Sequence, residues 1–234
     1  MNILLASTST LHGGNYLDYL KDEIEALFQG IDEILFIPFA RPGGISHEEY
    51  TEKAAAFFSE LNIKVRGLHE FEEMPEAIQN AEAYFTGGGN TFLLVKTLLE
   101  KNLMHFLKEN IESGKPYLGT SAGSNIGGIN MKTTNDMPIV YPPGFECMEL
   151  VPFNINPHYL DPDPLLKHNG ETRETRIQEF LTQNDIMVAG LREGNWIRRI
   201  GDKITVEGSE MTRIFEKGKE PYEIEPGSEI GSAM

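Results

Sequence analysis

Short apolar runs alternate with amphipathic stretches along most of the chain. Uninterrupted apolar runs predict buried strands, whereas apolar residues three or four positions apart, such as Leu20, Ile24 and Leu27, predict helices. Ser46 followed by Glu49 predicts a capping box at the start of one helix. The predicted strands lie at 2–7, 33–39, 63–68, 83–86, from 117 onward, 150–155 and 186–191, and the predicted helices at 16–28, 46–61, 92–99, 104–113 and 172–181, with a short helix opened by Pro75.

Continuous apolar strands separated by amphipathic helices are typical of a mostly parallel sheet covered on both faces. The segments 196–208 and 212–225 differ, because their strands are separated by Gly-Asp and Lys-Gly turns, which predicts an antiparallel C-terminal edge. We therefore expect an α/β fold, a three-layer sandwich whose ligand lies at the carboxyl ends of the strands. A length of 234 residues favours one domain over 1–234.

Charge and cysteine content narrow the classes of function. Lys and Arg number 20 against 36 Asp and Glu, a net charge of −16 that disfavours nucleic acid and anionic membranes as partners. An acidic ligand would need its own local cation. The single cysteine, Cys147, excludes an internal disulfide and a multi-cysteine metal site, which favours a cytoplasmic protein. The N-terminal apolar run is too short for a membrane span and predicts neither anchor nor signal peptide.

Two glycine-rich turns carry candidate chemistry. Gly-Thr-Ser-Ala-Gly around Ser121 has the spacing of a nucleophile elbow, although a helix-capping serine in a close-packed turn fits the same residues. The cluster 87–90, Gly-Gly-Gly-Asn, follows a predicted strand and opens a helix, so its amides form an anion cradle or simply a tight turn. It matches neither the Walker nor the Rossmann spacing, which disfavours a phosphate site.

A serine nucleophile needs a base and a group that orients the base. Among the six histidines, His158 stands out because it follows an apolar strand and Pro157, where a strand-end residue faces the ligand site. Glu193 occupies the same position after the strand at 186–191; taken alone it reads as an exposed turn residue.

Several motifs together resemble one family. GGGNTF, GTSAGSN, TTNDMPIV, INPHY, GETRETRI and LREGNW, in this order between residues 87 and 196, are similar to peptidase E, the aspartyl dipeptidase family of serine peptidases. The likeness covers nearly the whole chain. It implies a fold akin to class I glutamine amidotransferases, with serine in place of cysteine, and hydrolysis of small acidic dipeptides that begin with aspartate, without metal or organic cofactor. It demands no partner and is compatible with a monomer.

The resemblance also implies roles for individual residues. It makes Ser121 the nucleophile, His158 the base and Glu193 the third member of the triad. The remaining positions it assigns are the oxyanion-hole amides of Gly88 and Ala122 and the substrate-binding or activity-linked residues Asn90, Asp136 and Arg173. Thr120 and Ser124 depart from residues common among relatives, which bears on the shape of the pocket.

Alternatives stay open for the substrate-binding positions. Arg173 suits a bidentate contact with an aspartyl carboxylate, but it could instead pair with Glu171 or Glu174, and Arg176 is the reserve cation. Asp136 could hold the substrate ammonium or brace its loop. Three other functions compete: a cyanophycinase-like peptidase, a glutamine amidotransferase-like domain, and a catalytically silent protein that binds a small anion.

Overall fold

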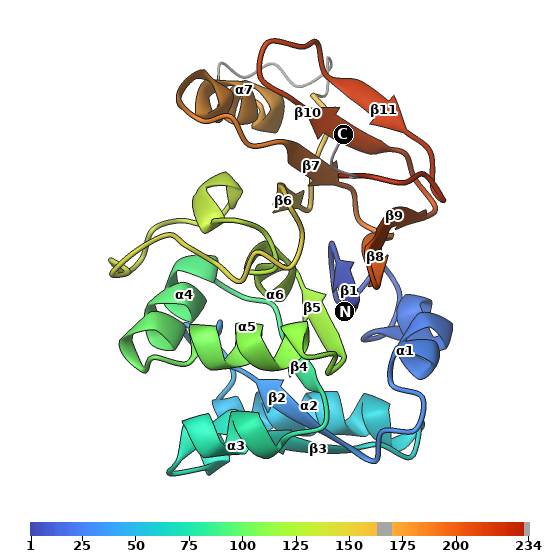
Figure 1. Cartoon of the computed structure of the whole chain (residues 1–234), viewed down its shortest axis with the longest axis vertical. Helices are drawn as coiled ribbons and strands as arrows, with labels where there is room; N and C mark the ends of the chain where they lie inside the picture. The colour runs from blue at the N-terminus through green and yellow to red at the C-terminus, as the bar shows by residue number, and fades with distance from the viewer. Residues whose placement is uncertain (163–169, 232–234) are drawn as a thin grey trace.

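The computed structural model describes residues 1–162 and 170–231, which form two sheets. The larger sheet has seven strands in the order β3-β2-β4-β5-β1-β8-β9 (Figure 1). β8 pairs antiparallel with β1 and with β9, whereas the other five strands are parallel, which confirms the predicted mostly parallel sheet with an antiparallel C-terminal edge. Its strands are β1 (Asn2–Ala6), β2 (Glu33–Ile37), β3 (Lys64–Gly67), β4 (Tyr84–Thr86), β5 (Tyr117–Thr120), β8 (Asn195–Ile200) and β9 (Lys203–Gly208).

Helices cover both faces of this sheet. Successive strand residues point to opposite faces, so Leu4 and Phe36 belong to one buried cluster while Leu5 and Ile37 belong to another. The first cluster is closed by α1 (Lys21–Leu27) and α2 (His47–Ser59), and the second by α3 (Met74–Asn80), α4 (Thr91–Glu100) and α5 (Met104–Glu112). The arrangement is the predicted three-layer sandwich. Short helices are α6 (Ala122–Asn125) and the single turns η1 (Asp18–Leu20), η2 (Leu68–Glu70) and η3 (Met131–Thr133).

The smaller sheet has four strands in the order β11-β10-β7-β6 and is covered by α7 (Figure 1). Its core consists of Tyr159, Ile177, Leu181, Val188 and Phe215. β6 and β7 are parallel, and β10 and β11 add to them antiparallel. The elements are β6 (Asn154–Pro157), α7 (Arg173–Gln183), β7 (Val188–Leu191), β10 (Thr212–Phe215) and β11 (Tyr222–Ile224).

The sequence predicts a regular alternation of strands and helices around a mostly parallel sheet, and the second sheet departs from that pattern. The antiparallel strand β8 occupies the edge of β1 where a further parallel strand would pair, so β6 and β7 build a sheet of their own. The strand expected at 150–155 begins only at Asn154, because the preceding apolar residues, Leu150 and Val151, donate their amides to Gly127 in a buried loop.

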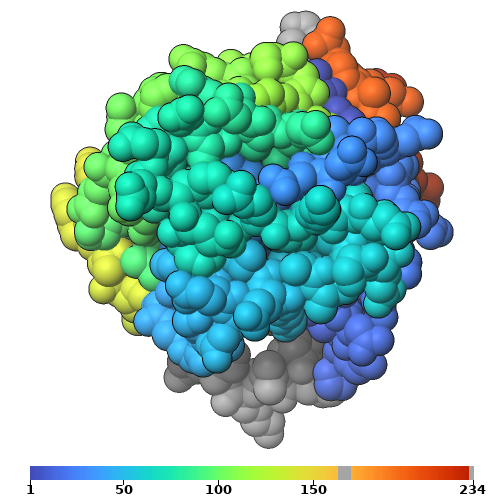
Figure 2. All heavy atoms as spheres, turned by 90° about the horizontal axis from the view of Figure 1, so that it is seen from below, coloured from blue at the N-terminus to red at the C-terminus, as the bar shows by residue number. Residues whose placement is uncertain are grey.

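Much of the first half of the chain forms one end of the molecule, whereas β8 and β9 from the second half return to lie beside β1 (Figure 1). Seen from below, the surface is formed mainly by the first half, blue to green in Figure 2, with the C-terminal segments at the rim. Within the described ranges, no helix is long and apolar enough to cross a membrane.

Candidate active site

Ser121 occupies a sharp turn between β5 and α6. Its backbone is left-handed, with φ 53° and ψ −109°, and its amide donates to the carbonyl of Ala6 at 3.0 Å. Its side chain makes no capping hydrogen bond, so the hydroxyl is not a helix cap. A Cβ on Gly123 would lie 2.2 Å from the carbonyl oxygen of Thr86, so the turn can pack against β4 only with glycine there. Close packing and a partly exposed serine therefore come from the same turn.

His158 and Glu193 meet Ser121 from the ends of β6 and β7. The Nε2 atom of His158 lies 3.0 Å from the Ser121 hydroxyl oxygen, and its Nδ1 atom lies 2.7 Å from Oε1 of Glu193. The side chains of His158 and Glu193 are 35% and 44% exposed, so the row opens to solvent. The structure thus brings together three side chains that the sequence separates by up to 72 positions (193 − 121).

A buried serine, Ser7, accepts a hydrogen bond from the backbone amide of His158. His158 has a left-handed backbone, with φ 53°, and its amide donates to the hydroxyl oxygen of Ser7 at 2.8 Å. The Ser7 hydroxyl in turn donates to the carbonyl of Leu191 at 2.7 Å. Ser7 follows β1 and is fully buried, so it links the ends of β1, β6 and β7 at the position of His158.

Gly88, one of the two residues expected to form the oxyanion hole, lies beside the serine. A Cβ on Gly88 would lie 3.1 Å from Cβ and 3.6 Å from Oγ of Ser121, which places this glycine against the hydroxyl-bearing side chain. In the described part of the chain, neither the Gly88 nor the Ala122 amide donates to a backbone carbonyl. The Tyr50 hydroxyl donates to the Gly88 carbonyl at 3.3 Å and orients that turn.

Asn90 and Asp136 are joined through the start of α4. Asn90 caps the helix by accepting from the Leu93 amide, and its Nδ2 donates to the Met137 carbonyl. Oδ2 of Asp136 accepts from the Thr91 amide at 2.7 Å. Asp136 therefore braces its loop against the helix, and only its other carboxylate oxygen is left for a ligand.

Arg173 is the half-buried first residue of α7. The carboxylates that the sequence offered as partners are taken: Glu171 pairs with Arg176, and Glu174 with Arg213. No ion pair with Arg173 occurs among the described residues. Burial and the nearby Arg176 lower the pKa of its guanidinium, while Asp136 and Glu193 act in the opposite direction. Arg173 thus lies in the electrostatic field of the site.

A family model supplies the decisive comparison. The model of peptidase family S51 matches residues 3–207 of the chain. The chain belongs to peptidase family S51. This confirms the resemblance seen in the motifs and the predicted serine-type peptidase.

Curated relatives of this S51 peptidase match it over nearly its whole length. It is 43% identical over 234 residues to peptidase E of Streptomyces coelicolor, a match that covers 100% of this chain and 95% of the relative. It is 40% identical to a Drosophila melanogaster protein named probable alpha-aspartyl dipeptidase, covering 98% and 95%. It is also 40% identical to peptidase E of Shigella flexneri, covering 97% and 99%.

A solved structure shares the fold of the S51 peptidase. The crystal structure of a peptidase from an acI-B1 Actinobacterium superposes with a TM-score of 0.74 at 19% sequence identity, over 99% of this chain and 96% of that one. At this identity the likeness concerns the fold alone, and it agrees with the α/β architecture described above.

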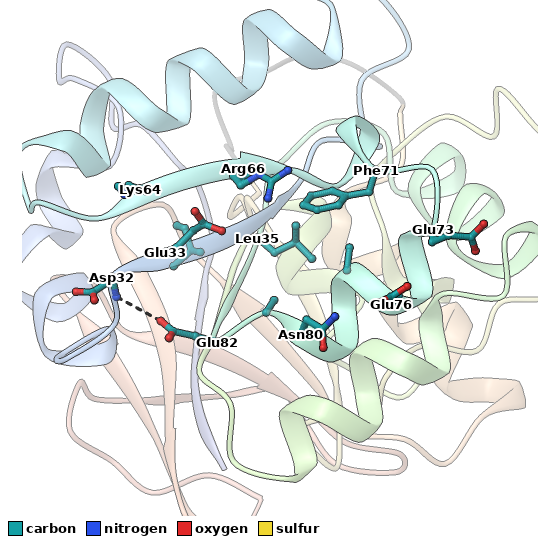
Figure 3. Close-up of a pocket in the computed structure, with 13 residues that line it drawn as sticks. Asp32, Glu33, Leu35, Lys64, Arg66, Phe71, Glu73, Glu76, Asn80 and Glu82 are labelled. Carbon is teal, nitrogen blue, oxygen red and sulfur yellow. Dashed lines mark hydrogen bonds between the residues drawn. The ribbon is translucent and has the colours of Figure 1, made fainter.

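A pocket of about 590 Å³ lies away from the site of the S51 peptidase (Figure 3). It is lined by residues from the start of β2, from β3 and from α3, among them Glu33 and Arg66, whose guanidinium stacks over Phe71 at 4.1 Å. Since β2, β4 and β5 are parallel, the start of β2 lies at the opposite end of the sheet from Ser121. The pocket therefore plays no part in the site.

Sequence reasoning missed Ser7, although it stands in the N-terminal motif LLASTSTL. Its position directly after a buried strand was a signal, but a serine there is equally typical of an ordinary strand end.

In the described ranges, no group of three or more His, Cys, Asp or Glu side chains is arranged to hold a metal ion.

Proposed function

We propose that this S51 peptidase hydrolyses dipeptides with an N-terminal aspartate through Ser121, His158 and Glu193. The observation that carries the proposal is the hydrogen-bonded row of these side chains, at 3.0 and 2.7 Å, with the hydroxyl on a left-handed turn. A serine activated by a histidine that a carboxylate orients is the arrangement that acyl transfer requires. The names of the relatives support the aspartyl dipeptidase specificity.

The proposed reaction has two halves. Nε2 of His158 takes the hydroxyl proton while Oγ of Ser121 forms a bond to the carbonyl carbon, and the amides of Gly88 and Ala122 donate to the resulting oxyanion. The imidazolium, whose Nδ1–H donates a hydrogen bond to Glu193, then gives its Nε2 proton to the leaving amine as the peptide bond breaks. An aspartyl ester on Ser121 remains. His158 takes a proton from water, whose oxygen attacks the carbonyl carbon of this ester, and the imidazolium then protonates Oγ of Ser121 as the ester bond breaks and aspartate leaves.

The proposed specificity depends on charge. Arg173 is a half-buried cation with no carboxylate partner in the described ranges, so it suits the side-chain carboxylate of the substrate. It also offsets locally the repulsion of a chain with a net charge of −16. Asp136 retains one free oxygen that suits the substrate ammonium.

The first experiment tests the nucleophile. Ser121→Ala should abolish hydrolysis of Asp-Leu while leaving the free energy of unfolding within about 1 kcal/mol of the parent. Hydrolysis at the parental rate by this variant would exclude Ser121.

The parent should also cleave Asp-Leu far faster than Ala-Leu, and equal rates would overturn the acidic pocket. Digestion of an aspartate-arginine polymer, or ammonia release from glutamine, would favour the cyanophycinase-like or amidotransferase-like alternative. Tight binding of a small anion without turnover of any aspartyl dipeptide would favour the silent binding protein.

A second experiment tests the cation. Arg173→Ala should raise KM for Asp-Leu roughly 10- to 100-fold, the worth of one or two charge-assisted hydrogen bonds. Labelling of Ser121 by a small fluorophosphonate should be unaffected, because that reagent carries no aspartyl carboxylate. Arg176→Ala is the matched control on the same helix, since Arg176 is exposed and pairs with Glu171. An equal rise in KM for both variants would contradict a specific role for Arg173.

A further inference from the structure

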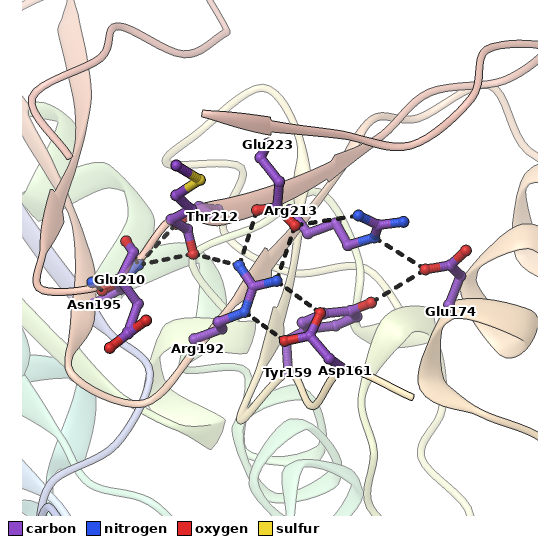
Figure 4. Close-up of polar contacts among 10 residues, drawn as sticks. Tyr159, Asp161, Glu174, Arg192, Asn195, Glu210, Thr212, Arg213 and Glu223 are labelled. Atoms are coloured by element: carbon purple, nitrogen blue, oxygen red, sulfur yellow. Dashed lines mark hydrogen bonds and ion pairs between the residues drawn. The ribbon is translucent and has the colours of Figure 1, made fainter. Parts of the chain in front are cut away.

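A connected set of charged side chains lies beside the site in the smaller sheet (Figure 4). We call it the ion frame and define it as Asp161, Glu174, Arg192, Arg213 and Glu223. All five N–H groups of Arg192 donate hydrogen bonds, either to other residues of the ion frame or to a carbonyl beside it. Two of them go to the carboxylate of Asp161 at 2.8 and 2.7 Å, two to Glu223 at 2.9 Å, and the fifth to the carbonyl of Met211. With every donor used, Arg192 has none to offer a substrate.

The frame continues from Glu223 to the helix that carries Arg173. Glu223, on β11, also accepts from Nη1 of Arg213 at 3.1 Å. Nε of Arg213 donates to Glu174 at 2.9 Å, and Glu174 lies in the first turn of α7. One chain of contacts thus joins the loop after β6, the turn after β7 and the start of α7.

Each end of the frame is next in sequence to a residue of the site. Arg192 immediately precedes Glu193, and its partner Asp161 comes three residues after His158. Glu174 immediately follows Arg173. The frame residues therefore lie in the same backbone segments as Glu193, His158 and Arg173, but the side chains of those three residues are not part of the frame.

We propose that the ion frame positions the site through two separate ends. The Arg192–Asp161 end sets the distance between Glu193 and His158, and the Arg213–Glu174 end sets the place of Arg173. The role assigned to the second end depends on the function proposed above. The frame residues act as positioning residues and touch no reacting atom.

The geometry favours positioning over a general gain in stability. An isolated exposed ion pair contributes little, whereas a bidentate arginine within a network fixes the orientation of its partners. The Arg192 side chain is only 16% exposed, in contrast to the 44% of neighbouring Glu193. Because Glu193 is open to solvent and on a turn, its orientation depends on its anchored neighbour. A misplacement of about 1 Å in such a group can cost up to about 100-fold in rate.

The first end is tested with Asp161→Asn, an isosteric change at a side chain that is 54% exposed, so the fold should be retained. We expect kcat for Asp-Leu and the rate of Ser121 labelling by a fluorophosphonate to fall together, about tenfold, with KM within about twofold of the parent. Arg192→Lys keeps the charge but cannot bridge both carboxylates, so it should show the same pattern. Unchanged kcat and labelling in both variants would overturn this end of the proposal.

The second end is tested with Glu174→Gln. Positioning predicts that KM for Asp-Leu rises about tenfold while the labelling rate stays within about twofold of the parent. A purely electrostatic effect predicts the opposite sign for KM, because removing a negative charge near an acidic substrate should tighten its binding. Arg213→Lys retains the charge and should also raise KM. A fall in KM for Glu174→Gln, or no change in both variants, would overturn this end.

Controls separate the frame from the proposed function. Arg198→Lys alters another half-buried arginine, which lies on β8. Its guanidinium donates to Ile3 and Asn2, at the far end of β1 from the site, and to the carbonyl of Arg199 on its own strand. This variant should leave kcat, KM and labelling unchanged. If the parent labels at Ser121 but does not cleave Asp-Leu, the aspartyl specificity is wrong while labelling still tests the first end. If the parent cleaves Asp-Leu and the frame variants behave like Arg198→Lys, the frame proposal alone fails.

Discussion

Two residues of the row have backbone conformations that side chains rarely adopt. Ser121 and His158 both have φ 53°; each such residue costs about 1 to 3 kcal/mol and persists only where its surroundings hold it. The Ser121 amide donates a hydrogen bond to the Ala6 carbonyl, and the His158 amide donates one to the Ser7 hydroxyl. At the residue scale, the positions of Ser121 and His158 therefore depend on two hydrogen bonds from backbone amides, whose acceptors lie on β1 or directly after it.

The hydrogen bond from the His158 amide to the Ser7 hydroxyl leads to a prediction about His158. Ser7→Ala removes the acceptor of the His158 amide and the donor to the Leu191 carbonyl, and should lower the free energy of unfolding by about 1 to 3 kcal/mol. Because the imidazole loses its backbone support, kcat for Asp-Leu should fall about tenfold or more with little change in KM. Steady-state kinetics and urea unfolding of the same preparation measure both effects.

Tyr84→Phe is the control for this prediction. Tyr84 is fully buried at the start of β4, and its hydroxyl donates to the Ile78 carbonyl at 2.6 Å, so the variant should also lose stability. Tyr84 lies at the opposite end of the parallel strands from Ser121, and kcat should be retained. The same fall in kcat for both variants would mean that lost stability, rather than the position of His158, explains the effect of Ser7→Ala.

At the scale of elements, the capping box of α2 gives a prediction about stability alone. The Ser46 hydroxyl accepts from the Glu49 amide at 3.1 Å, and the Ser46 amide donates to the Glu49 carboxylate at 2.7 Å. Ser46→Ala should lower the free energy of unfolding by about 1 kcal/mol with kcat unchanged. Ser113→Ala, at the C-terminal end of α5, is the control, since its hydroxyl donates to a carbonyl and caps no amide. Urea unfolding should separate the two, and equal losses would contradict a role for the cap.

Much of the element order could be predicted from local residues. The capping box at Ser46 and the turn at Ser121 are specified within a few positions, because caps and tight turns depend on adjacent residues. The hydrogen-bonded row could be predicted from strand-end positions together with the family motifs, although His158 lies 37 and 35 positions from its two partners. The partners of β6 and β7 could not be predicted in this way, since an apolar run does not specify which strand it pairs with. Ser7 and Arg192 were missed because their residue types and positions do not specify their partners, which lie 151 and 31 positions away in the sequence.

At the scale of the whole molecule, polar contacts join the two sheets. The buried Asn195, at the start of β8, donates its side-chain amide to the Thr212 hydroxyl on β10, while its backbone carbonyl accepts from the Ser7 amide. The site lies where the sheets meet, because Ser121 comes from the larger sheet while His158 and Glu193 follow strands of the smaller one. Whatever loosens the smaller sheet should therefore affect His158 and Glu193 before Ser121.

The ion frame of the smaller sheet should weaken in acid. Hydrogen bonds from Arg192 lower the pKa of both Asp161 and Glu223 in the folded protein. Since carboxyls of the unfolded chain titrate near pH 4, the two groups contribute their full stabilisation above that pH. As the pH falls further, the unfolded state takes up protons first and the contribution is lost toward the lower pKa values of the folded state.

The Arg192→Met variant measures that contribution. In it, Asp161 loses its hydrogen-bonded cation and Glu223 keeps only Arg213, so the difference in free energy of unfolding between parent and variant should be larger at pH 6 than at pH 3. Arg198→Met is the control, because the hydrogen bonds of Arg198 go to carbonyl oxygens that do not titrate, so its difference should stay nearly constant with pH. A pH-independent difference for Arg192→Met would show that Arg192 stabilises the fold by packing rather than through the charges of Asp161 and Glu223.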